Sequence, residues 1–469
     1  MSPITRRELL AGAAAAAVAG GAVYELVDRL GQTPSRASAA GFPKEQHVLD
    51  GLRVVSDDGI EVVVPPLHHR IVTAKLRVAG DKASLVSARE ELTHALDSIE
   101  DGREPTPAGL GVTAAWGLPY FDRFVPEQAA AHIPTDVRAT RAKGHTIKAL
   151  TQSIRFPSDP QDVILEANDV AFLLRSDDKN AVESAAKTLL ALDFLEPTSV
   201  RVGFAGGGFE GGMSLPKRMA LAAGVPGADL VPHTSELFLG FTSTQKAGLG
   251  PTRIANFETL GYTNAQGGYF EGGTHMALSH IFEDLEAWYL TFDFRDRVDT
   301  TFDPGMKAKP GAQTLAQGPR QVASVGKVVK AFHKTGTMGH SASLQTTSRL
   351  TEDVRGSDGT VYVKGTAIPH RADFNTLDNP FAWSADPQKD GMGEAAAAGV
   401  HFVVFNPSSD DFKRNRLAMD GVLPDGTRLP FQRGARGQGL NSVLQTTHRQ
   451  NFLVPPRRHR SFPLVELLQ

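Results

Sequence analysis

The chain of 469 residues contains no cysteine. It therefore has no disulfide bond, no thiolate metal ligand, no iron–sulfur cluster and no cysteine nucleophile. Neither sign of charge is in excess, because 49 lysines and arginines nearly balance 52 aspartates and glutamates. The net charge of −3 provides neither the basic surface of a nucleic-acid-binding protein nor a polybasic membrane patch. The folded state must be stabilised by packing alone.

Long apolar runs are also scarce, and the one that stands out covers residues 9–23 and is rich in alanine and glycine. Arg6 and Arg7 precede it, and Ala37-Ser38-Ala39 follows it. This order is typical of an export signal, and the paired arginines favour the twin-arginine route, on which proteins cross the membrane folded. The run is shorter than the ~20 residues of a spanning helix, although a retained membrane anchor is the alternative.

We therefore expect a signal peptide over residues 1–39 that engages the twin-arginine translocase. The mature protein would lie in the periplasm, at the cell surface or outside the cell, without a membrane-spanning segment. Its roughly 430 residues are too many for one hydrophobic core, so two domains are expected.

Alternation of apolar residues predicts strands, and a spacing of three to four residues predicts helices. In the first half these patterns predict strands over 68–78, 109–117, 170–174 and 199–204, and helices over 82–99 and 180–192. In the second half they predict strands over 268–280 and 400–406, helices over 281–292 and 409–419, and a loop with a short helix over 314–331.

Two strand–helix–strand units in succession are typical of a ferredoxin-like α+β fold with an antiparallel sheet. The order of elements therefore predicts two such domains, over residues 40–225 and 226–469. The boundary is placed in the glycine- and proline-rich stretch 224–228. A basic cluster over 457–460 is expected to be solvated.

Six segments of the chain resemble, in order, those of the dye-decolourising peroxidase superfamily. They are residues 113–123, 236–244, 272–278, 339–340, 368–375 and 400–417. The resemblance implies a fold of the dimeric α+β barrel type with haem b bound in the C-terminal domain. It also implies peroxide-dependent oxidation of a small organic donor, and a homo-oligomer is compatible with it.

The resemblance also assigns roles to residues around the haem. His340 matches the axial ligand of the iron, a role that needs a nitrogen donor. On the other face a cation stabilises the charge that develops as the peroxide O–O bond breaks. Arg371 and the adjacent His370 are the two candidates for this position, and the match to the superfamily leaves both open. Arg371 would also contact the haem.

Ser243 stands where the superfamily has the aspartate that carries a proton between the peroxide oxygens. A serine hydroxyl orients water or peroxide but does not act as an acid near neutral pH. Asp373 is a candidate substitute, with a salt bridge or a loop cap as the alternative role.

The sequence therefore predicts an exported haem-binding protein that resembles a peroxidase and leaves open whether it turns over. The alternative is a catalytically silent protein of the same fold that binds haem or another ligand, which the replacement of the aspartate by Ser243 favours. The absence of internal repeats and low-complexity linkers counts against a secreted structural module.

Overall fold

The computed structural model describes residues 24, 26, 27, 41–205, 209, 211–315, 323–379 and 395–469. The predicted cleavage site at residues 37–39 lies outside these ranges, as does most of the predicted signal peptide and part of the loop expected over 314–331. Within the predicted signal segment, the hydroxyl of Tyr24 donates a hydrogen bond to Asp378 Oδ1 at 3.1 Å.

The first half of the chain contains strands and helices in alternation. The strands are β1 (Arg53–Asp57), β2 (Ile60–Val64), β3 (His68–Leu76), β4 (Gly111–Gly117), β5 (Ile164–Leu165), β6 (Val170–Ser176) and β7 (Leu195–Phe204). The helices are α3 (Lys82–Glu100), α4 (Leu118–Phe124), α5 (Pro126–His132), α6 (Val137–Lys143), α7 (Lys179–Leu190) and α8 (Leu215–Ala222).

The second half repeats this alternation with more helices. The strands are β8 (Thr274–Glu283), β9 (Val354–Arg355), β10 (Val361–Tyr362), β11 (His370–Arg371), β12 (Phe374–Thr376), β13 (Gly399–Asn406) and β14 (Leu444–Val454). The helices are α9 (Leu285–Thr291), α10 (Phe294–Thr301), α11 (Val325–Thr335), α12 (His340–Ser348) and α13 (Ser409–Met419).

Each half forms an antiparallel sheet with the ferredoxin-like strand order. In the first sheet the order is β7-β3-β6-β4, with α3 between β3 and β4 and α7 between β6 and β7. In the second sheet β12 and β11 pair with β13, β13 with β8, and β8 with β14. Both sheets therefore place the first strand of the unit beside its third and fourth strands, which confirms the predicted fold class.

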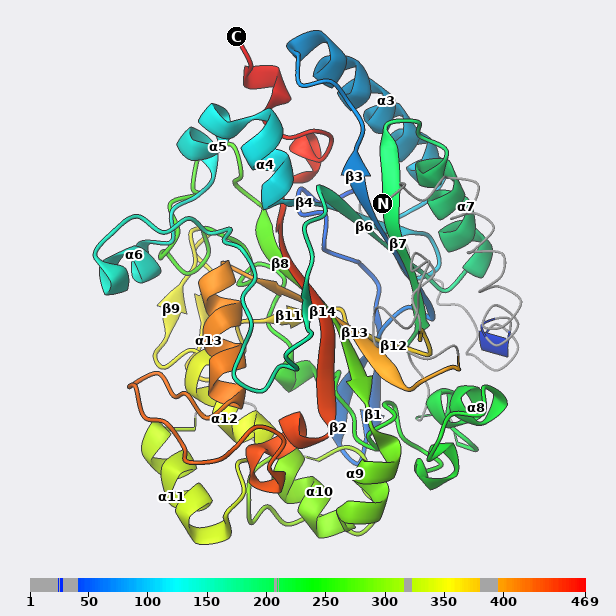
Figure 1. Ribbon diagram of the computed structural model, residues 1–469, viewed down its shortest axis with the longest axis vertical. Coiled ribbons are helices and arrows are strands. Elements are labelled where there is room, and N and C mark those ends of the chain that lie inside the picture. The colour runs from blue at the N-terminus through cyan, green and yellow to red at the C-terminus, as the bar shows by residue number, and fades with distance from the viewer. Residues whose placement is uncertain are drawn as a thin grey trace.

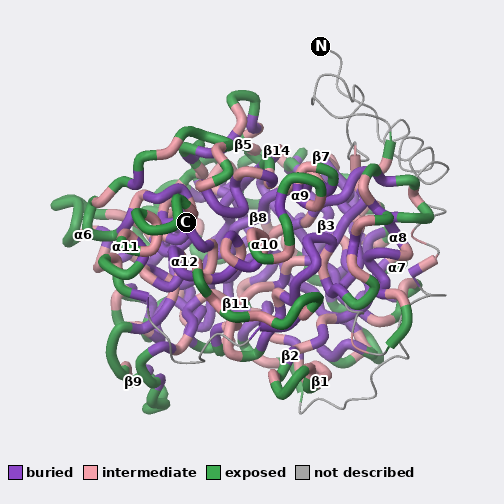
Figure 2. Tube along the Cα trace, turned by 90° about the horizontal axis from the view of Figure 1, so that it is seen from below, coloured by how far each residue is buried: buried purple, intermediate pink, exposed green. Residues whose placement is uncertain are grey.

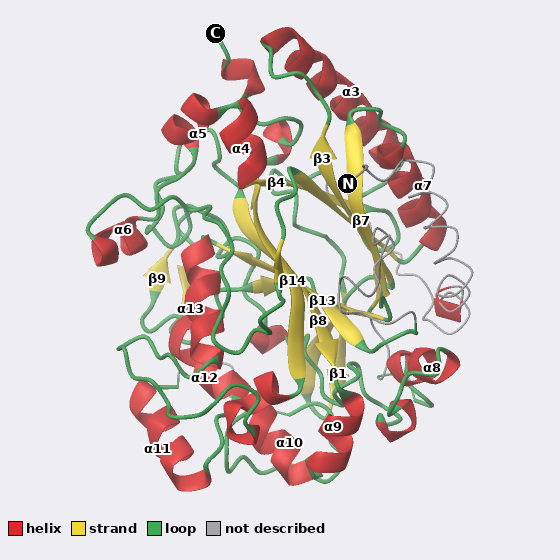
Figure 3. Ribbon diagram, viewed as in Figure 1, coloured by secondary structure: helices red, strands yellow, loops and turns green. Residues whose placement is uncertain are grey.

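The two sheets join at both edges and close into a barrel. Strand β14 pairs with β4, and β7 meets β12 where Phe204 lies opposite Asn375. Figures 1 and 3 show the strands at the centre of the molecule, with helices on the outside. Figure 2 shows the buried residues concentrated along these central strands.

The barrel interior is filled by apolar side chains from both sheets. These include Ile71, Leu173, Met276, Leu278, Val403, Phe405 and Phe452, all of them fully buried. Strand β6 is buried along its whole length, because one face lies in the barrel and the other packs under the helices. The outer face of the first sheet is covered by α3 and α7.

Some elements differ from the prediction. Strand β8 continues to Glu283, and the following helix begins only at Leu285, because Asp284 caps it by accepting a hydrogen bond from the Ala287 amide. The β1–β2 hairpin and β14 were not predicted. The predicted domain boundary falls in the connection between the two sheets, just after α8. None of the helices in the described part of the chain is long and apolar enough to span a bilayer.

Truncating a side chain in the barrel core should strongly lower the stability of the fold. Phe405 has no exposed surface, so Phe405→Ala should lower the free energy of unfolding by about 3–5 kcal/mol. Leu290→Ala is the control, because Leu290 is 71% exposed and should change it by less than about 0.5 kcal/mol. Urea unfolding measures both values, and equal losses would contradict the assignment of Phe405 to the core.

Candidate functional site

A cavity of about 270 Å³ lies beside the second sheet, near the lower end of the ~300–1,000 Å³ range of small-molecule sites. Its sheet wall is formed by alternate residues of β8 and β13, because successive side chains of a strand point to opposite faces. The remaining walls come from α12, α13 and the loop that contains Ser243. Most of the lining is apolar and includes Leu237, Leu239, Phe241, Ile281, Phe302, Leu344, Val400, Phe402, Val404 and Phe412.

His340 is the first residue of α12 and lines this cavity. The preceding Gly339 is required there, because a Cβ atom would lie 2.2 Å from the carbonyl oxygen of Phe302. That same carbonyl accepts a hydrogen bond from the Ala342 amide, which anchors the first turn of the helix.

The imidazole of His340 is neutral at ordinary pH. Burial, together with the positive charges of Arg371 and Arg416, lowers the pKa of His340 to about 3. Among the described residues, no group forms a hydrogen bond with the His340 ring. A neutral imidazole with a free nitrogen at a cavity wall is the form that binds a metal.

Arg371, Ser243 and Asp373 form a connected polar group on the same cavity. The Arg371 guanidinium donates to the Ser243 hydroxyl at 3.3 Å and also to the Ser243 carbonyl. The Ser243 hydroxyl donates to Asp373 Oδ2 at 3.3 Å. The other oxygen of Asp373, Oδ1, is buried without a hydrogen-bond partner in the described structure.

His370 does not line the cavity, so the structure places only Arg371 of the two candidates there. The two residues are adjacent on β11 and point to opposite sides. The ring of His370 stacks on Phe405 in the barrel interior, with centroids 6.0 Å apart, and lies at the same distance from the ring of His47. Of the two adjacent candidates, the alternation of side chains along β11 therefore brings Arg371 to this cavity and His370 to the barrel interior.

Two buried carboxyl groups near Ser243 were missed by the sequence analysis. Glu236 accepts hydrogen bonds from the Ser243 amide at 3.0 Å and from the Thr244 hydroxyl, and burial raises its pKa to about 7. Glu283 lines the cavity from the end of β8. Glu236 lies in a segment that the resemblance covers, so a signal for it was present in the sequence. Glu283 lies at the end of a strand, and its sequence context does not distinguish a buried carboxylate from a solvated one.

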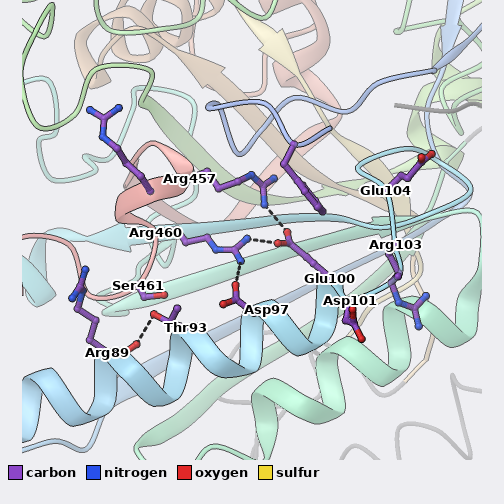
Figure 4. Close-up of a pocket in the computed structure, with 13 residues that line it drawn as sticks. Arg89, Thr93, Asp97, Glu100, Asp101, Arg103, Glu104, Arg457, Arg460 and Ser461 are labelled. Carbon is purple, nitrogen blue, oxygen red and sulfur yellow. Dashed lines mark hydrogen bonds and ion pairs between the residues drawn. The ribbon is translucent and has the colours of Figure 1, made fainter. Parts of the chain in front are cut away.

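A second hollow, of about 770 Å³, lies between α3 and the C-terminal residues (Figure 4). Glu100 accepts hydrogen bonds from Arg457 at 2.7 Å and from Arg460 at 2.6 Å, and Asp97 accepts one from Arg460 at 3.1 Å. The prediction that this basic cluster is solvated is wrong for the buried Arg460 and the partly buried Arg457. Acidic side chains therefore neutralise both of these arginines within the fold.

The fold and the site define a ferredoxin-like α+β barrel protein with a cavity beside its second sheet. Residues 66–456 match the model of a family of unknown function, DUF7405, and the chain belongs to that family. No curated protein sequence matches the chain significantly.

Solved structures that resemble the chain are peroxidases of the DyP type. The encapsulated enzyme of Mycobacterium smegmatis is 11% identical with a TM-score of 0.49, over 85% of this chain and 95% of that one. A putative DyP-type peroxidase of Shewanella oneidensis is 11% identical with a TM-score of 0.48, over 86% and 96%. A heme complex of a Rhodococcus jostii DypB variant is 11% identical with a TM-score of 0.49, over 89% and 98%.

These structures belong to the superfamily that the sequence motifs resemble. At this identity, and with TM-scores below 0.5, the function has to be argued from the residues of this chain.

The buried histidines make the fold sensitive to acid. Burial lowers the pKa of His370 to about 3 and that of His47 to about 4, whereas in the unfolded chain both would take up a proton below about pH 6.5. The unfolded state therefore binds more protons below this pH. The free energy of unfolding should fall by up to about 1.4 kcal/mol per pH unit for each histidine as pH falls from about 6.5 towards 4.

Urea unfolding at about pH 7 and pH 5 tests this expectation on His370→Phe, which keeps an aromatic ring against Phe405. The variant should lose less stability than the wild type between the two pH values. The same loss in both proteins would show that His370 takes up no extra proton on unfolding.

Proposed function

We propose that the protein binds haem b in the cavity beside its second sheet, reduces peroxide and oxidises a small organic donor. One observation carries the proposal. The neutral imidazole of His340, which no described residue binds through a hydrogen bond, lines the same apolar cavity as the linked polar residues Arg371, Ser243 and Asp373.

The residues present fit haem in their donor chemistry. His340 would supply the axial nitrogen, and the apolar walls would exclude water from the bound ring. Arg349 and Arg371 both line the cavity and carry the charge that binds carboxylates such as haem propionates. Bound haem would supply an iron centre that exchanges electrons with peroxide and with the donor.

The protein's own contribution is to place charge and protons beside the peroxide. The Arg371 guanidinium, held by the hydroxyl and carbonyl of Ser243, stabilises negative charge as the O–O bond breaks. Asp373 presents an oxygen, Oδ1, that no described residue binds and that can accept a proton. Ser243 links the two groups and fixes their orientation, but its hydroxyl does not replace the proton-carrying aspartate of the superfamily.

Ser243 also favours a second candidate function, a haem- or ligand-binding protein of the same fold without turnover. In this alternative the cavity holds its ligand, and the Arg371–Ser243–Asp373 network serves binding alone. Normal haem binding with no peroxide-driven oxidation of a dye, from acid to neutral pH, would select it.

We further propose that the protein is exported folded by the twin-arginine route. The paired Arg6 and Arg7, the apolar run after them and the absence of cysteine support this. Folding before export suits a protein that takes up its cofactor in the cytoplasm.

Haem titration of the purified protein tests the proposed function. The wild type should develop a Soret band at one haem per chain, and His340→Ala should lose it or shift it strongly, because the axial nitrogen is removed. His333→Ala is the matched control, since this histidine is exposed on α11 and should leave the band unchanged. A wild type that shows no Soret band at any haem ratio would refute the proposal.

A further inference from the structure

The carboxyl group of Glu283 lies in the cavity without a hydrogen-bond partner for its buried oxygen Oε2 among the described residues. Glu283 is the last residue of β8, and alternation along the strand places it on the same face as Ser279 and Ile281, which also line the cavity. Its backbone is fixed by a hydrogen bond from its amide to the Ala398 carbonyl at 3.0 Å. A rigid strand therefore holds the carboxyl group at the cavity wall.

Charged groups of both signs line the cavity around Glu283. Asp373 approaches from the connection between β11 and β12, and its negative charge acts on Glu283. Tyr289, on α9, feels the charge of Glu283 in turn. Glu236 lies behind Ser243 and feels the charge of Asp373, but it does not line the cavity. Among the cations, Arg371 is directed to Ser243, Arg349 to the Gly365 carbonyl, and Arg416 and Arg449 to Asp159.

We propose that Glu283 is the acid that delivers a proton to peroxide in this cavity, taking over the task of the aspartate that Ser243 replaces. This inference rests on the proposed function. It is carried by the placement of two carboxyl groups, Glu283 and Asp373, on one cavity, each with a buried oxygen that no described residue satisfies. Unpaired buried carboxyl oxygens are costly, and a ligand or a proton satisfies them.

The electrostatics separate the roles of the two groups. Burial raises the pKa of Glu283 to about 8, and the charge of Asp373 contributes to the rise, so Glu283 holds a proton at neutral pH. Two carboxyl groups with different surroundings can serve as acid and base in one site. Glu283 is then the acid, and Asp373 is the acceptor.

The proton balance of the step is complete. Reduction of one hydrogen peroxide to two waters consumes two electrons, which the organic donor supplies, and two protons. As the O–O bond breaks, Glu283 gives its proton to the departing oxygen, which leaves as water. Asp373 accepts the proton of the other peroxide oxygen and later returns it to that oxygen, which takes its second proton from solvent. Glu283 regains its own proton from solvent, so the two protons consumed both come from solvent.

A haem-free experiment tests whether Glu283 holds the proton. Infrared spectra of the wild type should show a protonated-carboxyl C=O band that disappears with a midpoint near pH 8, as burial of Glu283 requires. Glu283→Gln should lack this band. Glu258→Gln is the control, because Glu258 is also a buried carboxyl with a raised pKa but does not line the cavity. A band with a midpoint near pH 8 that persists in Glu283→Gln overturns the inference.

A second experiment uses the haem-loaded protein. Glu283→Gln should bind haem with an unchanged Soret band but lose about 100-fold or more in kcat, with little change in KM for the donor. Glu283→Asp should restore part of the rate, and the wild-type rate should fall as pH rises through about 8. Wild-type turnover in Glu283→Gln overturns the inference and leaves the proposed function intact.

The two failures are distinguishable. A wild type that binds no haem, or that binds haem without turnover, refutes the peroxidase proposal and the assignment of Glu283 to peroxide with it. The infrared titration then still decides whether Glu283 carries a proton in this cavity.

Discussion

The two faces of the second sheet are kept apart by the alternation of side chains along β8 and β13, and the site depends on this separation. One face carries Met276, Leu278, Val403 and Phe405 into the closed barrel, which they fill. The other face, between the sheet and α12 and α13, is where the cavity lies. A shift of one residue in register would exchange the two faces.

Within the cavity, the protein neutralises some of its charges and leaves others for a ligand. Asp159 binds Arg449 at 2.9 Å and Arg416 at 3.2 Å, so these two arginines are compensated within the fold. The carboxyl groups of Asp373 and Glu283 each keep a buried oxygen without a described partner. In a site of low dielectric, such carboxyl groups interact strongly with a bound ligand. A reaction that moves charge and protons in this cavity would use these groups.

The sequence predicted the fold better than the site. Helical spacing and strand alternation located α3, α7, β13 and α13 closely, because their buried faces repeat with a regular period. Strand β14 was missed. It lies at the joint of the two sheets and is buried along most of its length, with polar residues such as Gln450 satisfied by long-range hydrogen bonds that sequence does not reveal.

The site residues also differed in how well the sequence predicted them. His340, Ser243, Arg371 and Asp373 were selected by their order along the chain, and the structure brings all four to one cavity. The choice between His370 and Arg371 depended on which residue of β11 faces out of the barrel. The register of β11 against β13 decides this, and the sequence alone does not reveal that register. Glu283 had no sequence signal, because its burial comes from segments far away in the chain.

The central claim is that His340 is an axial ligand held at the wall of an apolar cavity, and chemical rescue tests it most directly. His340→Gly would remove the imidazole and leave space for a free one. Haem-loaded His340→Gly should lose the wild-type Soret spectrum and regain it when imidazole is added. A variant whose spectrum equals that of the wild type before imidazole is added would show that another residue binds the iron and would contradict the account.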